Sequence, residues 1–139
     1  MVKSVQTLTY FNVLIISAIN GPAIGAGLCL AQGGCDIRIA SISKASMGFT
    51  FNRLGLHPGM GALHFAPLLI GPANAADLLI TGRVIKAEEA LKMGLVNKIC
   101  DDVLEESFKF AEEIRKAAPK AVETTVKGGF IYKRVLPTI

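Results

Sequence analysis

The stretch from Asn20 to Ala31 reads NGPAIGAGLCLA and joins a buried strand to the start of a helix through a glycine-rich turn. The run before it, Asn12 to Ile19 (NVLIISAI), is almost wholly apolar and rich in β-branched residues, which predicts a strand buried on both faces. The turn is expected over Pro22 to Gly27. Leu28 to Gln32 has helical potential, which the two glycines that follow are expected to end.

This turn has the geometry to bind a negative charge. The first N–H groups of a helix have no intrahelical partner and point at whatever lies beyond the helix start. They could bind a phosphate, or hold the oxygen of a thioester as it becomes an enolate. The dinucleotide pattern G-x-G-x-x-G is not satisfied, because Leu30 stands where the third glycine would be, and no Walker loop occurs. On the residues alone, a tight turn without a ligand explains the pattern equally well.

The rest of the chain alternates short strands with helices and places its strands early. The alternating stretch Asp36 to Ala40 (DIRIA) predicts a half-buried strand with Arg38 on the polar side. A short extended piece is expected over Ala45 to Phe51. Further elements are predicted as a helix from after Gly61 to about Ile70, a break at Gly71-Pro72, helices over 74–81 and 86–92, and a strand over 95–100.

The clearest helix is predicted from Asp101 to about Ala117, and a last helical stretch from Ala121. The 101–117 segment is acidic in its first turn and basic in its last, which complements the helix macrodipole. Its apolar residues cover a wide arc, so this helix could pack on its own core and on another subunit. The class is α/β or α+β, with a break near Gly82 between a strand-and-turn core (1–82) and a helical region (83–139).

Composition limits the classes of function. The chain has 139 residues, 51% of them hydrophobic, and a net charge of +4, which suits one globular domain or part of one. Without Trp or a basic stripe interleaved with aromatics, nucleic acid is a poor candidate partner. Three irregularly spaced cysteines favour a reducing compartment and no metal site. No signal peptide or membrane span is evident, so an intracellular, soluble protein is expected.

Several motifs in register resemble the crotonase family, the enoyl-CoA hydratases and isomerases. NGPAIGAGLCLA followed by CDIRIAS is similar to the family signature N-G-x-A-x-G-G-G-x-E-L-A and its C-D-x-R-x-A strand. Residues 47–56, 58–62 and 79–98 resemble three later family segments in the same order. The resemblance runs from about Val13 to Lys127. It implies a ClpP/crotonase-like spiral of ββα turns, whose N-terminal part is missing here, and a C-terminal helical region that builds trimers.

The resemblance also implies roles for individual residues. The backbone N–H of Ala26 would be one donor of an oxyanion hole, and Gly27 would allow the substrate to approach closely. Gly25 and Gly59 would begin helices whose dipoles add to the site, and Arg53 could meet a phosphate of coenzyme A. The implied substrate is an acyl-CoA thioester of fatty acid metabolism, with coenzyme A as part of the substrate and no permanently bound cofactor. A homotrimer or dimer of trimers is expected.

Three departures from the family pattern bear on the chemistry. The two glutamates that place and deprotonate water in the hydratases align with Cys29 and Phe51, and neither side chain can do carboxylate acid–base work. A further acidic position of some isomerases falls near Gly59 and is also empty. One residue more than usual precedes Cys35, and the segment from Met1 to Tyr10 does not resemble the N-terminal part of the family.

Other groups could take over part of the missing chemistry. A helix start would favour a thiolate at Cys29, but a small buried apolar side chain is the favoured interpretation. His57 could exchange protons near neutral pH, although a hydrogen-bonded structural histidine is the commoner case. A solvated surface role is favoured for Arg53. His64 is expected in the core, and Asp36 in a structural role.

Three functions therefore compete. The first is a lyase or isomerase that acts on acyl-CoA thioesters through an enolate, with isomerisation or decarboxylation as plausible as hydration. The second is a non-catalytic relative that binds CoA thioesters or only assembles with active paralogues, which the replaced glutamates and the missing N-terminal part favour. The third and weakest is a nucleotide-binding α/β fragment.

Overall fold

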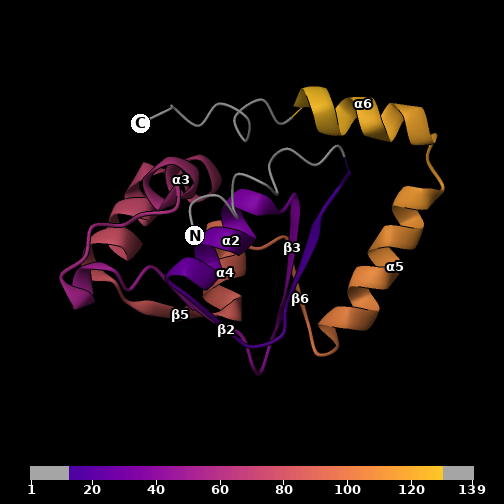
Figure 1. The fold of residues 1–139 in the computed structure, drawn as a ribbon. Coiled ribbons are helices and arrows are strands. Elements are labelled where there is room, and N and C mark those ends of the chain that lie inside the picture. Colours follow the sequence, from indigo (N-terminus) through magenta and orange to yellow (C-terminus); the bar gives the residue numbers. More distant parts are fainter. Residues whose placement is uncertain (1–12, 130–139) are drawn as a thin grey trace.

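The computed structural model describes residues 13–129, which fold around two three-stranded sheets (Figure 1). In the first sheet all strands are parallel, and their spatial order is β1 (Ile16–Ile19), β3 (Ile37–Ser41) and β6 (Lys98–Cys100). The second has the order β2 (Pro22–Ile24), β4 (Ser46–Gly48) and β5 (Val84–Lys86), with β2 and β4 parallel and β5 antiparallel to β4. The predicted α/β class is confirmed.

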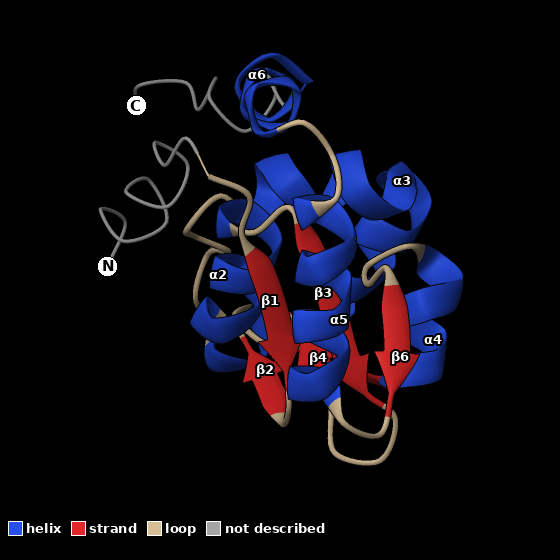
Figure 2. Ribbon diagram, turned by 90° about the vertical axis from the view of Figure 1, so that its right-hand side faces the viewer, coloured by secondary structure: helices blue, strands red, loops and turns tan. Residues whose placement is uncertain are grey.

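Helices cover the first sheet on both sides. The helical elements are α2 (Ala26–Gly34), α3 (Ala62–Thr81), α4 (Ala87–Met93), α5 (Val103–Arg115) and α6 (Pro119–Gly129), with a 3₁₀ turn, η1, at Asn52–Leu54. Helix α5 packs on β1, β3 and β6, while α2, α3 and α4 lie on the opposite side (Figures 1 and 2). This layering buries β3, the central strand, on both faces.

The chain winds through the two sheets in successive turns. It passes from β1 in the first sheet to β2 in the second and then into α2, and repeats the path through β3, β4 and α3. Beyond Gly82 the chain returns to the second sheet with β5 and to the first with β6. The sheets and helices share one apolar core, in which Leu28, Met47 and Leu78 are fully buried.

The prediction of a half-buried strand at Asp36 to Ala40 was wrong at Arg38. This side chain is only 4% exposed, and its guanidinium donates to the carbonyls of Leu95 at 2.7 Å and Cys35 at 3.1 Å. Alternation predicts a solvated side only when one face of the sheet is open. Because β3 lies between β1 and β6 and under helices on both sides, its charged residue is buried and satisfied by backbone oxygens instead.

The boundaries around the glycine-rich turn also differ from those predicted. Pro22–Ile24 forms β2, because each of its residues pairs with β4 (Pro22 with Ser46, Ile24 with Gly48). Helix α2 then starts at Ala26 and continues through both glycines to Gly34. Those two glycines are buried, so tertiary packing outweighs the low helix propensity that predicted an earlier end.

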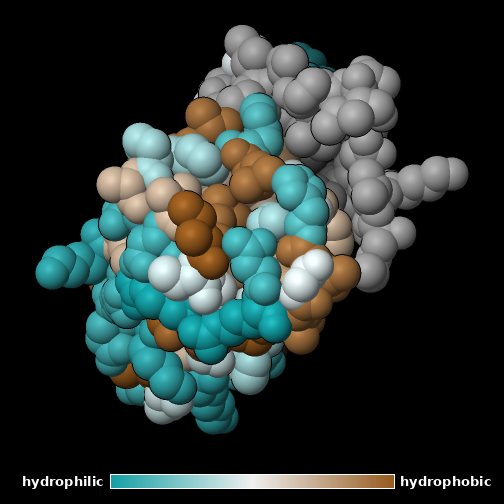
Figure 3. Space-filling view, turned by 90° about the vertical axis from the view of Figure 1, so that its left-hand side faces the viewer, coloured by the Kyte–Doolittle hydropathy of each residue, from teal (hydrophilic) through white to brown (hydrophobic). Residues whose placement is uncertain are grey.

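The predicted break at Gly71-Pro72 is confirmed as a kink inside α3. Gly71 has φ 75° and ψ 160°, and helical geometry resumes at Pro72. Among the described residues, α3 alone is long and apolar enough to cross a membrane by length and composition. Its buried side chains, such as Phe65 and Leu78, belong to the protein core. Burial accounts for part of its apolar composition, because 33% of the apolar window is buried whereas Leu63, Leu68 and Ile80 are exposed. On the side of the molecule that carries α3, apolar side chains lie among polar ones at the surface (Figure 3).

The helices after Gly82 largely follow the sequence signals. Gly94 ends α4 in the left-handed region (φ 83°), as expected. Asp102 caps α5 by accepting the N–H groups of Leu104 and Glu105. Helix α6 begins at Pro119 rather than at Ala121, which suits a proline in the first turn of a helix. Residues before 13 and after 129, including the N-terminal segment considered above, lie outside the described range.

Candidate active site

The start of α2 forms a turn that only glycine adopts readily. Gly25 is buried, with φ 55° and ψ −114°, and its N–H donates to the carbonyl of Gly48 at 2.8 Å. The carbonyl of Gly25 accepts the N–H of Cys29 at 3.0 Å and so begins the helix. No side chain caps this end of α2. Ala26 is half-buried and Gly27 is exposed, so the N–H groups at this helix start are left without a side-chain cap in a part of the turn that is not fully buried.

The segment after β4 borders this turn. A Cβ placed on Gly25 would lie 3.8 Å from Oγ1 of Thr50 and 3.9 Å from Cζ of Phe51. Strand β2 pairs in parallel with β4, and the hydrogen bond from Gly25 to Gly48 extends this pairing by one residue. Because Thr50 and Phe51 directly follow β4, this register places their side chains next to the turn. The aromatic ring of Phe51, which is predicted to occupy the second glutamate position, thus lies beside the expected oxyanion donor. Thr50, which the sequence analysis missed, adds a hydroxyl one residue before it.

Cys29 lies one turn into α2 and is fully buried. Its thiol donates to the carbonyl of Gly59 at a sulfur–oxygen distance of 3.8 Å. Burial raises the pKa of the Cys29 thiol to about 12, although its backbone hydrogen bond acts in the opposite direction. The thiol is therefore neutral at physiological pH, which agrees with the favoured interpretation of an apolar, unreactive side chain.

The contact between Cys29 and Gly59 joins the starts of α2 and α3. The same Gly59 carbonyl accepts the N–H of Ala62. Between them, Met60 (φ 53°) and Gly61 (φ 77°) both adopt left-handed backbone conformations. A non-glycine residue in this region is uncommon and often marks a functional site. The structure thus brings Gly59 to the side of α2 that carries Cys29, the predicted first glutamate position.

The other predicted residues lie in different surroundings. Arg53 donates through Nε to the carbonyl of Thr81 at 3.1 Å, and Asn52 donates to the carbonyl of Leu79 at 2.9 Å. Both side chains therefore satisfy the C-terminal end of α3. His57 is exposed, and His64 is half-buried with its ring against Phe65 at a centroid distance of 4.9 Å. The expectation of a core position for His64 was wrong, and the catalytic roles of the other residues stay predictions.

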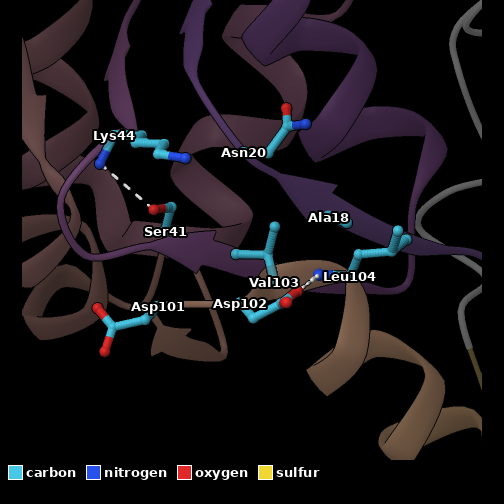
Figure 4. A pocket seen from close by; sticks show the side chains of 8 residues that line it. All are labelled: Ala18, Asn20, Ser41, Lys44, Asp101, Asp102, Val103 and Leu104. Carbon is cyan, nitrogen blue, oxygen red and sulfur yellow. Dashed lines mark hydrogen bonds between the residues drawn. The ribbon is translucent and has the colours of Figure 1, made fainter.

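A recess of about 390 Å³ lies apart from this turn, at the carboxyl ends of β1 and β3 and next to the start of α5 (Figure 4). Its lining includes Lys44, whose backbone N–H donates to Ser41 Oγ at 3.3 Å, and Asp101. Asp102 Oδ1 accepts the N–H of Leu104 at 3.1 Å. Because this carboxylate already caps α5, the recess offers no free helix start to an anion, in contrast to the turn at Gly25.

Comparison with known proteins identifies the family. A sequence model described as enoyl-CoA hydratase/isomerase matches residues 1–129. A short-chain-enoyl-CoA hydratase of Clostridioides difficile is 45% identical over 111 residues, covering 78% of this chain and 70% of the relative. A crotonyl-CoA hydratase of Syntrophomonas wolfei is 43% identical over 110 residues, covering 78% of this chain and 42% of the relative. The chain belongs to the enoyl-CoA hydratase/isomerase family.

Solved structures confirm the crotonase-type fold. A probable enoyl-CoA hydratase/isomerase from Mycobacterium abscessus superposes with a TM-score of 0.89 at 33% identity, covering 95% of this chain and 51% of that one. A putative enoyl-CoA hydratase from Thermobifida fusca, solved in complex with CoA, superposes with a TM-score of 0.80 at 30% identity. The match covers 86% of this chain and 47% of that one. The chain therefore spans about half of the solved domains it matches, and the expectation of a partial domain is confirmed.

Proposed function

We propose that this chain acts on acyl-CoA thioesters by stabilising an enolate, and that the backbone N–H of Ala26 donates to the thioester oxygen. The observation that carries the proposal is the buried, left-handed Gly25 turn, which leaves the first N–H groups of α2 without a side-chain cap. One preorganised donor of this kind contributes about 3 kcal/mol to transition-state stabilisation in enzymes that use it. Gly27 carries no side chain that would obstruct the approach of the substrate.

The names of the relatives support the substrate class. Several are called enoyl-CoA or crotonyl-CoA hydratases, and one solved neighbour contains CoA. For this chain the proposed ligand is likewise a CoA thioester of fatty acid metabolism. Coenzyme A arrives as part of the substrate, and no permanently bound cofactor is proposed.

The surroundings of the turn favour a lyase or isomerase reaction other than two-glutamate hydration. At the first glutamate position Cys29 is a buried neutral thiol, and at the second Phe51 is a hydrocarbon ring. Neither can hold and deprotonate a water molecule. The same facts favour the second candidate, a non-catalytic relative that binds CoA thioesters or assembles with active paralogues.

We also propose that the C-terminal region, residues 83–139, mediates assembly into a homotrimer or dimer of trimers. Leu104 and Phe108 on α5 are 60% and 65% exposed, although α5 packs on the first sheet with its other side. Burial of two such side chains against another subunit would contribute several kcal/mol. Light scattering should give a trimer or hexamer mass, and Phe108→Glu should lower it. An intracellular location stays a prediction.

A product search tests the proposed activity. The protein is incubated with enoyl-, dienoyl- and malonyl-type CoA thioesters, and product masses are read after chromatography that separates isomers. Gain of water, loss of carbon dioxide or a new isomer would each establish an enzyme and name its reaction. Thermal stabilisation by a thioester without any product would instead support the non-catalytic candidate.

Restoring both carboxylates tests the alignment of the two positions. Cys29→Glu with Phe51→Glu should raise hydratase activity on crotonyl-CoA in a protein with a complete pocket. The control pair, Cys100→Glu with Leu54→Glu, adds the same charges outside the turn and should give no gain. A folded double variant at Cys29 and Phe51 without any gain would refute the alignment.

A further inference from the structure

The two sheets end on the same side of the molecule. Strand β1 stands at one end of the first sheet and β2 at one end of the second, and both lie beside α2 (Figure 2). Within residues 13–129, β1 pairs along one edge with β3, and β2 pairs along one edge with β4. The outer edge of such a strand presents backbone donors and acceptors with which a further strand can pair.

The register shows which backbone groups of β1 face outward. The N–H of Ile37 donates to the carbonyl of Ile15 at 3.3 Å, which fixes the phase of the parallel ladder between β1 and β3. In a strand, the N–H and C=O groups of successive residues point to opposite edges. The backbone groups of Ser17 therefore face β3, whereas those of Ile16 and Ala18 face the outer edge.

Strand β2 has the same alternation. The N–H of Gly25 donates to the carbonyl of Gly48 at 2.8 Å, so Ala23 and Gly25 face β4, and Pro22 and Ile24 face the outer edge. Because proline has no N–H, this edge offers the two carbonyls and the N–H of Ile24. A strand that pairs here must therefore match a second edge with its own pattern of donors and acceptors.

Another recess, of about 260 Å³, lies between these two edges and α2. Its lining comes from β1, from the turn into β2 and from the outer side of α2, where Leu30 is 39% exposed. The wall includes small residues such as Ala18, Ala23, Gly27 and Ala31, which leave room for a larger apolar side chain. The surface thus combines strand-pairing groups with a pocket for a side chain, the two components of recognition by strand addition.

The order of the elements specifies the kind of partner that fits. The unit β1–β2–α2 is followed by the unit β3–β4–α3, with β3 parallel to β1 and β4 parallel to β2, and α3 packs on α2. The same step in the opposite direction places one strand parallel to β1, the next parallel to β2, and a helix beside α2. A single extended peptide would pair with one sheet only, so the geometry favours a ββα unit.

We propose that the surface formed by β1, β2 and the outer side of α2 binds a ββα unit of a second crotonase-type chain. The first strand of that unit pairs in parallel with β1 and the second with β2, and an apolar side chain enters the recess beside Leu30. This inference goes beyond the proposed thioester chemistry and does not require it. The superposed solved domains, of which this chain spans about half, show that more chain of this family is compatible with the fold.

The binding is tested with a partner of known sequence. This chain covers 42% of the Syntrophomonas wolfei relative, and the segment of that relative that precedes the match is produced as a separate chain. It is refolded alone and together with the 139-residue protein. Light scattering and calorimetry, both without a thioester, should give a one-to-one complex. No complex under either condition would overturn the proposal, and a failure of the thioester chemistry would be seen only in the separate activity assays.

Hydrogen exchange along β1 shows whether the partner binds by strand pairing. In the free protein the amides of Ser17 and Ile19, which face β3, should exchange slowly, and those of Ile16 and Ala18 should exchange rapidly. In the complex the amides of Ile16 and Ala18 should slow by about tenfold or more. Unchanged exchange in a complex that forms would overturn the strand pairing. Slowing that increases with the concentration of the 139-residue protein alone would assign the edge to a second copy, and would also overturn the proposal.

Matched variants test the recess. Leu30→Glu should weaken binding by about tenfold or more, because an unpaired charge is costly to bury. Leu91→Glu makes the same change at a helix position that is also 39% exposed but lies on α4, outside the recess, and should bind like the parent. Ala18→Pro removes an outward N–H, which an edge strand tolerates, and should weaken binding as well. Equal affinities of the Leu30→Glu and Leu91→Glu proteins, both folded by circular dichroism, would overturn the proposal.

Discussion

Gly48 is a position at which a single added methyl group should disturb the fold strongly. It lies in β4, between β2 and β5. A Cβ added there would be 2.8 Å from the carbonyl oxygen of Arg83, 3.1 Å from Cγ2 of Val84 and 3.2 Å from its Cα. Optimal contacts lie at about 3.5–4.0 Å. Two of the three atoms are backbone, so a side-chain rotation cannot relieve the overlap.

The neighbouring strand is also held in place. The guanidinium of Arg83 bonds Asp77 at 2.5 Å and Glu89 at 2.6 Å, which ties the start of β5 to α3 and α4. Relief of the overlap must therefore separate β4 from β5. Overpacking of this kind costs about 1–3 kcal/mol, and backbone obstacles favour the upper end. Replacing Gly by Ala also lowers the entropy of the unfolded chain, which offsets about 0.4–1 kcal/mol of this cost.

The expected net loss for Gly48→Ala is therefore about 2 kcal/mol. For a chain of this size that corresponds to a fall of roughly 6–8 °C in the unfolding temperature. Urea and thermal unfolding followed by circular dichroism measure both quantities. Gly21→Ala is the matched control, since a Cβ there meets nothing within 4 Å and Gly21 is not left-handed. Ordinary surface substitutions change the free energy of unfolding by less than about 0.5 kcal/mol. If the free energies of unfolding of the two variants differ by less than that, the reasoning is refuted.

Three further predictions follow from named contacts. Ala26→Pro removes the proposed oxyanion donor at the first helical position, where proline is tolerated; thioester turnover should fall about 10²–10³-fold with unchanged circular dichroism, and full activity would contradict the role of Ala26. Burial raises the pKa of the Cys29 thiol to about 12, against 9.0 for the ordinary thiol, so above pH 9 the unfolded state loses a proton that the folded state keeps. The free energy of unfolding should therefore fall by up to about 1.4 kcal/mol per pH unit between those values, a slope that urea titrations of Cys29→Ala should lack. Asp102→Ala removes the cap of α5 and should cost about 1 kcal/mol in urea unfolding, whereas an equal cost for the neighbouring Asp101→Ala would indicate a general charge effect.

Local signals in the sequence predicted the elements whose ends depend on a few adjacent residues. Gly71-Pro72 marks the kink in α3, and Gly94 ends α4 with a left-handed residue. The acidic residues at 101–102 open α5, where Asp102 forms the cap. In each case the deciding interaction lies within about four residues along the chain, so the sequence contains it directly.

Contacts between residues far apart in the chain explain where the predictions from the sequence were wrong. Pro22–Ile24 is a strand because it pairs with residues 46–48, and α2 is longer than predicted because its final glycines are buried. Arg38 is buried because helices cover both faces of its sheet and because Leu95, 57 residues away, supplies an acceptor. No local pattern reports such partners.

By itself the sequence determined the family, through several motifs in register, and the α/β class, through the order of its strands and helices. It also located the candidate turn, because a glycine-rich motif between a buried strand and a helix has a narrow set of backbone conformations. It also predicted that Cys29 and Phe51 replace the two glutamates, and this alignment stays a prediction. Only the tertiary structure decided what surrounds that turn. The parallel register of β2 with β4 brings Thr50 and Phe51 against Gly25, and the packing of α2 on α3 buries Cys29 on the carbonyl of Gly59. These neighbours come from segments about 25 to 30 residues away. Burial among distant segments raises the pKa of the Cys29 thiol, and the ring of Phe51 makes one side of the turn apolar.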